Sequence, residues 1–261
     1  MWRIPVVLAI ACALAPAATS AQTPSQRVYA AGSLRLAFDD IIALHAARTG
    51  VHFLPTYGPS GKLREEIEKG SLPAVFASAS PKHTEILLKA GKLRESTVFT
   101  RNSLCLMAAP GIAPRPDALI DLLLDPALRL GTSTPGADPS GDYTWALFRN
   151  VEKLRPGSFA KLDAKALKLT GSEVARDENE LPYARVFREK SADLFISYCT
   201  NAVATAKAVP GIDWVRFGPD LNVASAYAIG TTGAGGNAAQ AFVALVMSPE
   251  GQAILERYGF K

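Results

Sequence analysis

The sequence predicts an α/β protein built from mostly parallel sheets that are flanked by helices. One observation is a repeated order of short apolar strand, small-residue turn and helix along the chain. A second is a segment rich in Pro and Gly, residues 110–116, which separates two such sets. The chain has 261 residues, 48% of them hydrophobic and 20% charged, which is enough for one large domain or two modest ones.

The first set occupies the amino-terminal part of the chain. Apolar residues at helical spacing follow the first turn, and Gly50 ends that helix. The predicted strands are 27–30, 51–55, 74–77 and 103–109, and the predicted helices are 34–48, 60–68 and 81–90.

The second set follows the breaker-rich segment and includes a pair of helices that Ser248-Pro249 interrupts. Residues 162–170 fit either a helix or a strand. The predicted strands are 128–132, 192–198 and 225–230, and the predicted helices are 117–124, 143–154, 182–189 and 237–257.

Residues 1–21 have the features of a secretory signal peptide. Arg3 precedes an apolar run of about 15 residues, and Thr19-Ser20-Ala21 forms a small-residue exit. That run contains Pro5 and Pro16 and is short for a membrane span. We therefore expect an exported, soluble mature protein that is cleaved after Ala21.

The charge and the cysteine content exclude some classes of protein and leave one question open. Lys and Arg number 28 against 24 Asp and Glu, without a long basic run, so nucleic-acid binding is not indicated. The mature chain would keep Cys105 and Cys199, both in strand-like apolar runs. They could form a disulfide in an oxidising compartment or remain buried thiols.

Three predicted turns share a serine before a helix and an adjacent glycine. A helix N-terminus with a serine cap attracts anions, and glycine lets a ligand approach the backbone. Converging turns of this kind could bind a dianion with neutral donors only. The serines are Ser33, Ser60 and Ser140, beside Gly32, Gly61 and Gly141.

The stretch YGPSGKLR, residues 57–64, does not form a nucleotide phosphate loop. Two residues instead of four separate its first Gly from the Gly-Lys pair, and Leu63 stands where the hydroxyl should be.

Signals for an enzyme or a bound metal are weak. The chain has no G-x-S-x-G elbow, and Ser158 and Lys161 form a Ser-x-x-Lys pair without its usual companion motifs. The three histidines have no metal-like spacing. We expect no catalytic residue and no cofactor; an exported hydrolase that uses Ser158 and Lys161 is the rival hypothesis.

Several motifs together resemble the periplasmic molybdate-binding proteins of ABC transporters. They keep the order of that family over nearly the whole mature chain, and they run VYAAGSL, YGPSGKLREEIEKG, VFASAS, RNSLCLMAAPG, DPSGDYTWALF, ADLFISYCTNA and SPEGQAILERYGF. The resemblance implies a type II periplasmic-binding-protein (Venus-flytrap) fold with the ligand in an interdomain cleft. The implied domains are residues 27–106 plus 223–261 and residues 107–222.

The resemblance also implies a set of ligand-binding residues. Hydroxyls at positions matching Ser33, Ser60 and Tyr198 and a backbone N–H at Ser140 would hold molybdate or tungstate. A further backbone N–H would come from Leu181, next to Glu180. Asp138 and Asp142 depart from an anion site, because a carboxylate beside a dianion costs energy unless it points away or caps the helix.

The function that follows is capture of molybdate, with tungstate as a related ligand, in the periplasm by a monomer. The protein would then deliver the captured ion to the permease of an ABC transporter. The alternatives are the same fold binding another small anion, sulfate-like or organic, and a sensor partner that presents the ligand to a membrane kinase.

Overall fold

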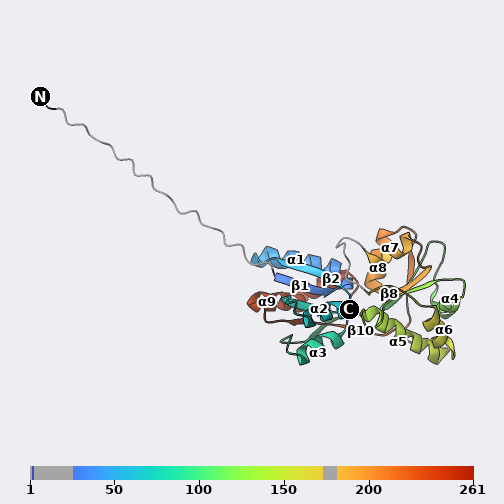
Figure 1. Ribbon diagram of the computed structural model, residues 1–261. Coiled ribbons are helices and arrows are strands. Elements are labelled where there is room, and N and C mark those ends of the chain that lie inside the picture. Colours follow the sequence, from blue (N-terminus) through green and yellow to red (C-terminus); the bar gives the residue numbers. More distant parts are fainter. Residues whose placement is uncertain (1, 3–25, 173–180) are drawn as a thin grey trace.

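The computed structural model describes residue 2 and residues 26–172 and 181–261. The predicted signal peptide lies outside these residues, apart from Trp2, and so does Glu180. Two five-stranded sheets, each with its own helices, form the two halves of the molecule in Figure 1. None of the described helices is both long and apolar enough to span a bilayer.

The first sheet has the strand order β2-β1-β3-β10-β4. Its strands are β1 (Gln26–Ala31), β2 (Phe53–Gly58), β3 (Val75–Ser78), β4 (Thr97–Asn102) and β10 (Ser225–Thr231). β1 pairs in parallel with β2 and β3, whereas β10 is antiparallel to β3 and β4. The chain thus returns from the second half of the molecule to complete the first sheet.

Side chains alternate between the two faces of the first sheet. Val28 and Ala30 pack in the cluster that includes Phe38 and Phe242, whereas Tyr29 joins Leu63, Ile67 and Leu87 on the opposite face. One face is therefore covered by α1, α9 and α10 and the other by α2 and α3. These helices are α1 (Arg35–Thr49), α2 (Ser60–Glu68), α3 (Pro81–Lys89), α9 (Gly236–Met247) and α10 (Pro249–Arg257).

The second sheet has the order β7-β6-β8-β5-β9. Its strands are β5 (Leu104–Ala108), β6 (Leu130–Ser133), β7 (Leu167–Thr170), β8 (Leu194–Tyr198) and β9 (Asp213–Arg216). β6 pairs in parallel with β7 and β8, and β5 is antiparallel to β8 and β9. Each sheet is therefore mixed, because one strand in each half runs against the parallel set.

Helices also cover both faces of the second sheet. Leu194 and Ile196 of β8 pack with Phe148 of α5, whereas Phe195 packs with Phe187 of α7 and the start of α8. The helices are α4 (Leu119–Leu124), α5 (Pro139–Leu154), α6 (Ser158–Lys165), α7 (Pro182–Arg188) and α8 (Cys199–Ala208).

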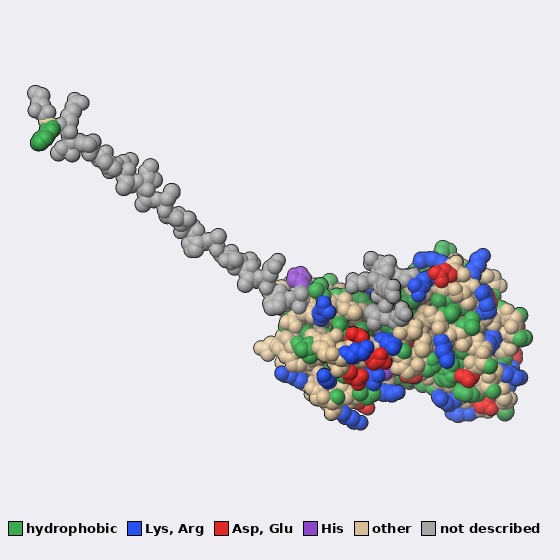
Figure 2. Space-filling model, in the orientation of Figure 1, with side chains coloured by type: hydrophobic (Ala, Val, Ile, Leu, Met, Phe, Trp, Pro, Cys, Tyr) green, Lys and Arg blue, Asp and Glu red, His purple; other side chains and the backbone are tan. Residues whose placement is uncertain are grey.

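The α/β fold class predicted from the sequence is confirmed. The division into residues 27–106 plus 223–261 and residues 107–222 stays a prediction. Basic and acidic side chains are mixed over the face of the molecule in Figure 2.

Candidate ligand-binding site

A cavity of about 450 Å³ lies between the two halves of the molecule. The first sheet contributes the carboxyl ends of β1 and β2 and Ala79 after β3. The second contributes the end of β7, the start of α7, the end of β8 and one face of α8. Ligands of α/β proteins bind beyond the carboxyl ends of strands, so this is where the fold favours a binding site.

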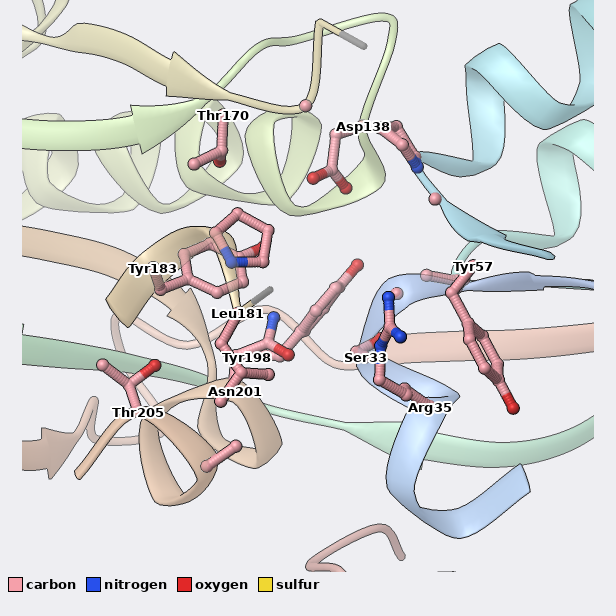
Figure 3. Close-up of a pocket in the computed structure, with 18 of the residues that line it drawn as sticks. Ser33, Arg35, Tyr57, Asp138, Thr170, Leu181, Tyr183, Tyr198, Asn201 and Thr205 are labelled. Carbon is pink, nitrogen blue, oxygen red and sulfur yellow. The ribbon is translucent and has the colours of Figure 1, made fainter. Parts of the chain in front are cut away.

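Ser33 lies in the short 3-10 turn after β1 and lines the cavity, as Figure 3 shows. Its Oγ is 2.8 Å from the Tyr227 hydroxyl, and the Asn102 amide donates to that same hydroxyl oxygen at 3.4 Å. Because the Tyr227 oxygen already accepts, its own proton can be donated to Ser33. That arrangement leaves the Ser33 proton for a ligand.

Ser60 begins α2 and is 1% exposed. Its Oγ accepts a hydrogen bond from the Ala79 N–H at 3.0 Å, so its proton also remains to be donated. Gly58, Pro59 and Ala79 line the cavity around it, although Ser60 itself is not part of the wall.

Ser140 is fully buried and lies behind the wall. Its backbone N–H donates to the Asp138 carboxylate at 3.0 Å, and its Oγ is 3.3 Å from Ser197 Oγ. The N–H that the resemblance assigned to the ligand is thus engaged by Asp138, which caps α5. Asp138 itself lines the cavity.

The Asp138 carboxyl is the one acidic group in the wall of this cavity among the described residues. Burial raises the pKa of Asp138 to about 6, against the opposing effect of the hydrogen bond from Ser140. An anion beside it therefore binds better when this carboxyl is protonated.

Tyr198 ends β8 and is 2% exposed. Its hydroxyl has no hydrogen-bond partner in the part of the chain that the structure describes, and it points into the space between Asp138 and Ser33 in Figure 3. A buried hydroxyl without a partner is costly unless a ligand or water satisfies it. Leu181 lines the cavity as the residue before α7.

Two arginines and one face of α8 belong to the cavity but were not expected from the sequence. Arg35 lines it, with its guanidinium 4.8 Å from the centre of the Tyr57 ring, and Arg185 lines it from α7. Asn201 and Thr205 line it from α8. Arg35 could have been found from the sequence, because it directly follows the turn that contains Ser33. The sequence of α8 has no comparable feature.

Gly61 serves the contact between the two halves rather than close approach of a ligand. Its N–H donates to the Ala137 carbonyl oxygen at 2.9 Å. A Cβ at position 61 would lie 2.6 Å from the carbonyl oxygens of both Gly136 and Ala137. Glycine is therefore required for α2 to approach the loop that precedes α5.

A disulfide joins Cys105 of β5 to Cys199, the residue after Tyr198. Their Cα atoms are 4.9 Å apart, and the Cys199 N–H donates to the Ser103 carbonyl. The start of α8 is therefore fastened beside the site, which answers the question that the sequence left open.

The hydrolase hypothesis finds no support. Ser158 is buried at the start of α6, whereas Lys161 is exposed, and no hydrogen bond joins them. In the described part of the chain, no three His, Cys, Asp or Glu side chains are grouped so as to hold a metal ion.

The chain resembles known proteins over most of its length. An uncharacterized Pasteurella multocida protein, PM1146, is 37% identical over 185 residues, which are 67% of this chain and 74% of that protein. The molybdate-binding protein ModA of Mycobacterium bovis is 29% identical, over 96% of this chain and 92% of its own. The solved sulfate-binding protein SubI of Mycobacterium tuberculosis has a TM-score of 0.77 at 19% identity, covering 90% of this chain and 86% of that one.

The likeness to SubI confirms the two-part α/β fold. The model of a family described as bacterial extracellular solute-binding proteins matches residues 26–261. This family consists of binding proteins, in agreement with the expectation that the chain is not an enzyme. The chain belongs to the family of bacterial extracellular solute-binding proteins.

Proposed function

We propose that this solute-binding protein captures molybdate or tungstate in the cavity between its two halves and delivers it to the permease of an ABC transporter. The relative ModA, which is named for molybdate binding, supports this ligand. A solved relative from Clostridium difficile, described as part of a molybdenum ABC transporter, supports the partner. Removal of residues 1–21 would release the protein into the periplasm, where it would act as a monomer.

The observation that carries this proposal is the set of hydroxyl groups with protons to donate. Ser60 accepts a hydrogen bond from the Ala79 N–H, Ser33 can accept one from the Tyr227 hydroxyl, and Tyr198 has no partner among the described residues. A fully deprotonated oxyanion can only accept hydrogen bonds, so hydroxyls with a proton free to donate suit it. Arg35 adds a positive charge to the wall.

The site is expected to bind its ligand as the two halves close on it. The Gly61–Ala137 hydrogen bond joins the halves at the edge of the site, so closure and ligand binding would favour each other. Leu181 and, once Asp138 moves away, Ser140 would add backbone donors. Discrimination among dianions would depend on cavity size and unpaired donors, since their charges are equal.

Calorimetric titration of Ser33→Ala and Ser60→Ala with molybdate tests the proposed ligand site. Each variant should bind more weakly by about 1–3 kcal/mol, because the oxyanion loses a donor in a buried site. Ser103→Ala changes a half-buried serine that accepts a hydrogen bond from Arg216 and does not line the cavity; it is the matched control and should bind like the wild type. Unchanged affinity in both site variants would refute the site.

A further inference from the structure

We propose that the cavity has a second compartment along α8 that takes the organic body of a substituted oxyanion. The ligand class is a phosphate monoester with a short, hydroxylated carbon body. The head of this ligand would occupy the oxyanion site of the proposed function, on which this part of the inference rests. The body would extend toward Thr205.

The size of the cavity is the first reason. Its volume is about 450 Å³. A tetrahedral oxyanion has only five heavy atoms. Cavities of about 300–1,000 Å³ are typical of sites for organic molecules. An inorganic oxyanion alone would leave most of this space to solvent.

The polar groups at the far end of the cavity are the second reason. Thr205 is 1% exposed, lines the cavity, and its Oγ1 has no hydrogen-bond partner among the described residues. Figure 3 places it on α8, at the opposite side of the cavity from Ser33 and Tyr57. A ligand oxygen or hydroxyl at this end would satisfy a group that an oxyanion beside Ser33 leaves unpaired.

Asn201 lies one turn before Thr205 on the same face of α8. Its Nδ2 donates to Ser197 Oγ at 3.0 Å, so its carbonyl oxygen remains to accept from a ligand hydroxyl. Hydroxyl groups both donate and accept, and therefore match Asn201 and Thr205 together.

The rest of the compartment favours a neutral carbon body over a second anionic group. Ala204 and Leu169 contribute apolar surface, and Tyr183 contributes its ring. Asp138 lies between the two ends of the cavity, where its carboxylate would repel a second negative charge but accept a hydrogen bond from a hydroxyl.

Calorimetric titration with three probes tests the inference: molybdate, inorganic phosphate and glycerol 3-phosphate. The wild type should bind glycerol 3-phosphate at least about tenfold more tightly than phosphate, because both share the head and only one has the body. Thr205→Val keeps the side-chain shape and removes the hydroxyl. This variant should weaken the binding of glycerol 3-phosphate by about three- to tenfold and leave the affinity for molybdate within about twofold of the wild type.

A steric variant gives a second, independent test. Ala204→Leu fills the compartment and should weaken the binding of glycerol 3-phosphate by at least about tenfold, again without changing the affinity for molybdate. Ser33→Ala should weaken both ligands, and thermal unfolding checks that each variant is folded.

The outcomes separate this inference from the proposed function. Glycerol 3-phosphate binding no tighter than phosphate, or unaffected by both α8 variants, overturns the second compartment even if molybdate binds. Tight glycerol 3-phosphate binding that both α8 variants weaken supports it, and it does so even if molybdate fails to bind. Failure of molybdate overturns only the proposed inorganic ligand.

Discussion

Replacing Asp138 by asparagine removes a charge from the cavity wall and keeps the shape of the first turn of α5. The asparagine side-chain oxygen can still accept the hydrogen bond from the Ser140 N–H, which is 3.0 Å long in the structure. The change therefore isolates the charge from the cap. We expect Asp138→Asn to bind molybdate more tightly than the wild type above pH 6 and about equally below it.

The size of the effect follows from the pKa of Asp138. Burial raises that pKa to about 6, so at pH 8 an anion must either bind beside a carboxylate or bind together with a proton. Taking up the proton at two pH units above the pKa costs about 2.7 kcal/mol, or roughly a hundredfold in affinity. This is the upper limit of the gain in the variant at pH 8. Wild-type affinity should rise as the pH falls through 6.

Calorimetric titration of both proteins at pH 5.5 and pH 8 measures this difference. Repeating the titration in two buffers of different ionisation heat counts the protons taken up, and the wild type should take up a proton at pH 8. Thermal unfolding of the unliganded proteins at each pH serves as the control for folding. The reasoning fails if wild-type affinity is the same at both pH values, or if Asp138→Asn binds molybdate more weakly at pH 8.

Three further predictions concern closure and stability. Gly61→Ala places a Cβ 2.6 Å from carbonyl oxygens of the other half, so calorimetry should show severalfold weaker molybdate binding. The control is Gly218→Ala, where the added Cβ meets open space and molybdate affinity should not change. Burial lowers the pKa of His83 from 6.5 to about 4, so the unfolded state binds a proton more readily than the folded state between these pH values. The free energy of unfolding therefore falls as the pH drops from 6.5 toward 4. The free energy of unfolding, measured in urea, should therefore fall between pH 7.5 and pH 5 by about 2 kcal/mol less in His83→Leu than in the wild type. An equal fall in both proteins would contradict this. Replacing Cys105 and Cys199 by serine should lower the free energy of unfolding by about 2–4 kcal/mol, since the bond closes a loop spanning 94 positions; an unchanged urea midpoint would contradict it.

The first half of the fold was readable because its signals are local. The turn before α1 and the start of α2 each combine a small residue with apolar residues at helical spacing, and the structure places both turns at the carboxyl ends of strands. The predicted serine cap of α2 is wrong, because Pro59 is the N-cap and Ser60 is the first residue of the helix, without a side-chain cap bond. The hydrogen bond between Ser33 and Tyr227 was not readable. It joins residues 194 positions apart and depends on β10 returning to the first sheet.

α8 was not predicted because its sequence, CTNAVATAKA, is made mostly of small residues without a clear apolar period. Thr205 and Asn201 therefore could not be placed at the site from the sequence. Asp138 was recognised as a departure from an anion site, but its double role was not. It caps α5 and lines the cavity, which requires the position of the Ser140 N–H as well as the cavity itself.

The edge strands β4 and β9 were also missed. They are short and mix polar with apolar residues, so only pairing with β10 and β5 shows them to be strands. The disulfide between Cys105 and Cys199 depends on the 4.9 Å between their Cα atoms, a distance that pairing of β5 with β8 sets and sequence spacing does not.

Titration of the full-length mature protein with molybdate, tungstate and sulfate tests the central claim most directly. Hydroxyls that have a proton to donate, set in a cavity between the two halves, predict one molybdate or tungstate bound per chain, with a rise in melting temperature. No heat and no thermal shift with either ion, alongside a response to sulfate or to an organic acid, would contradict the claim.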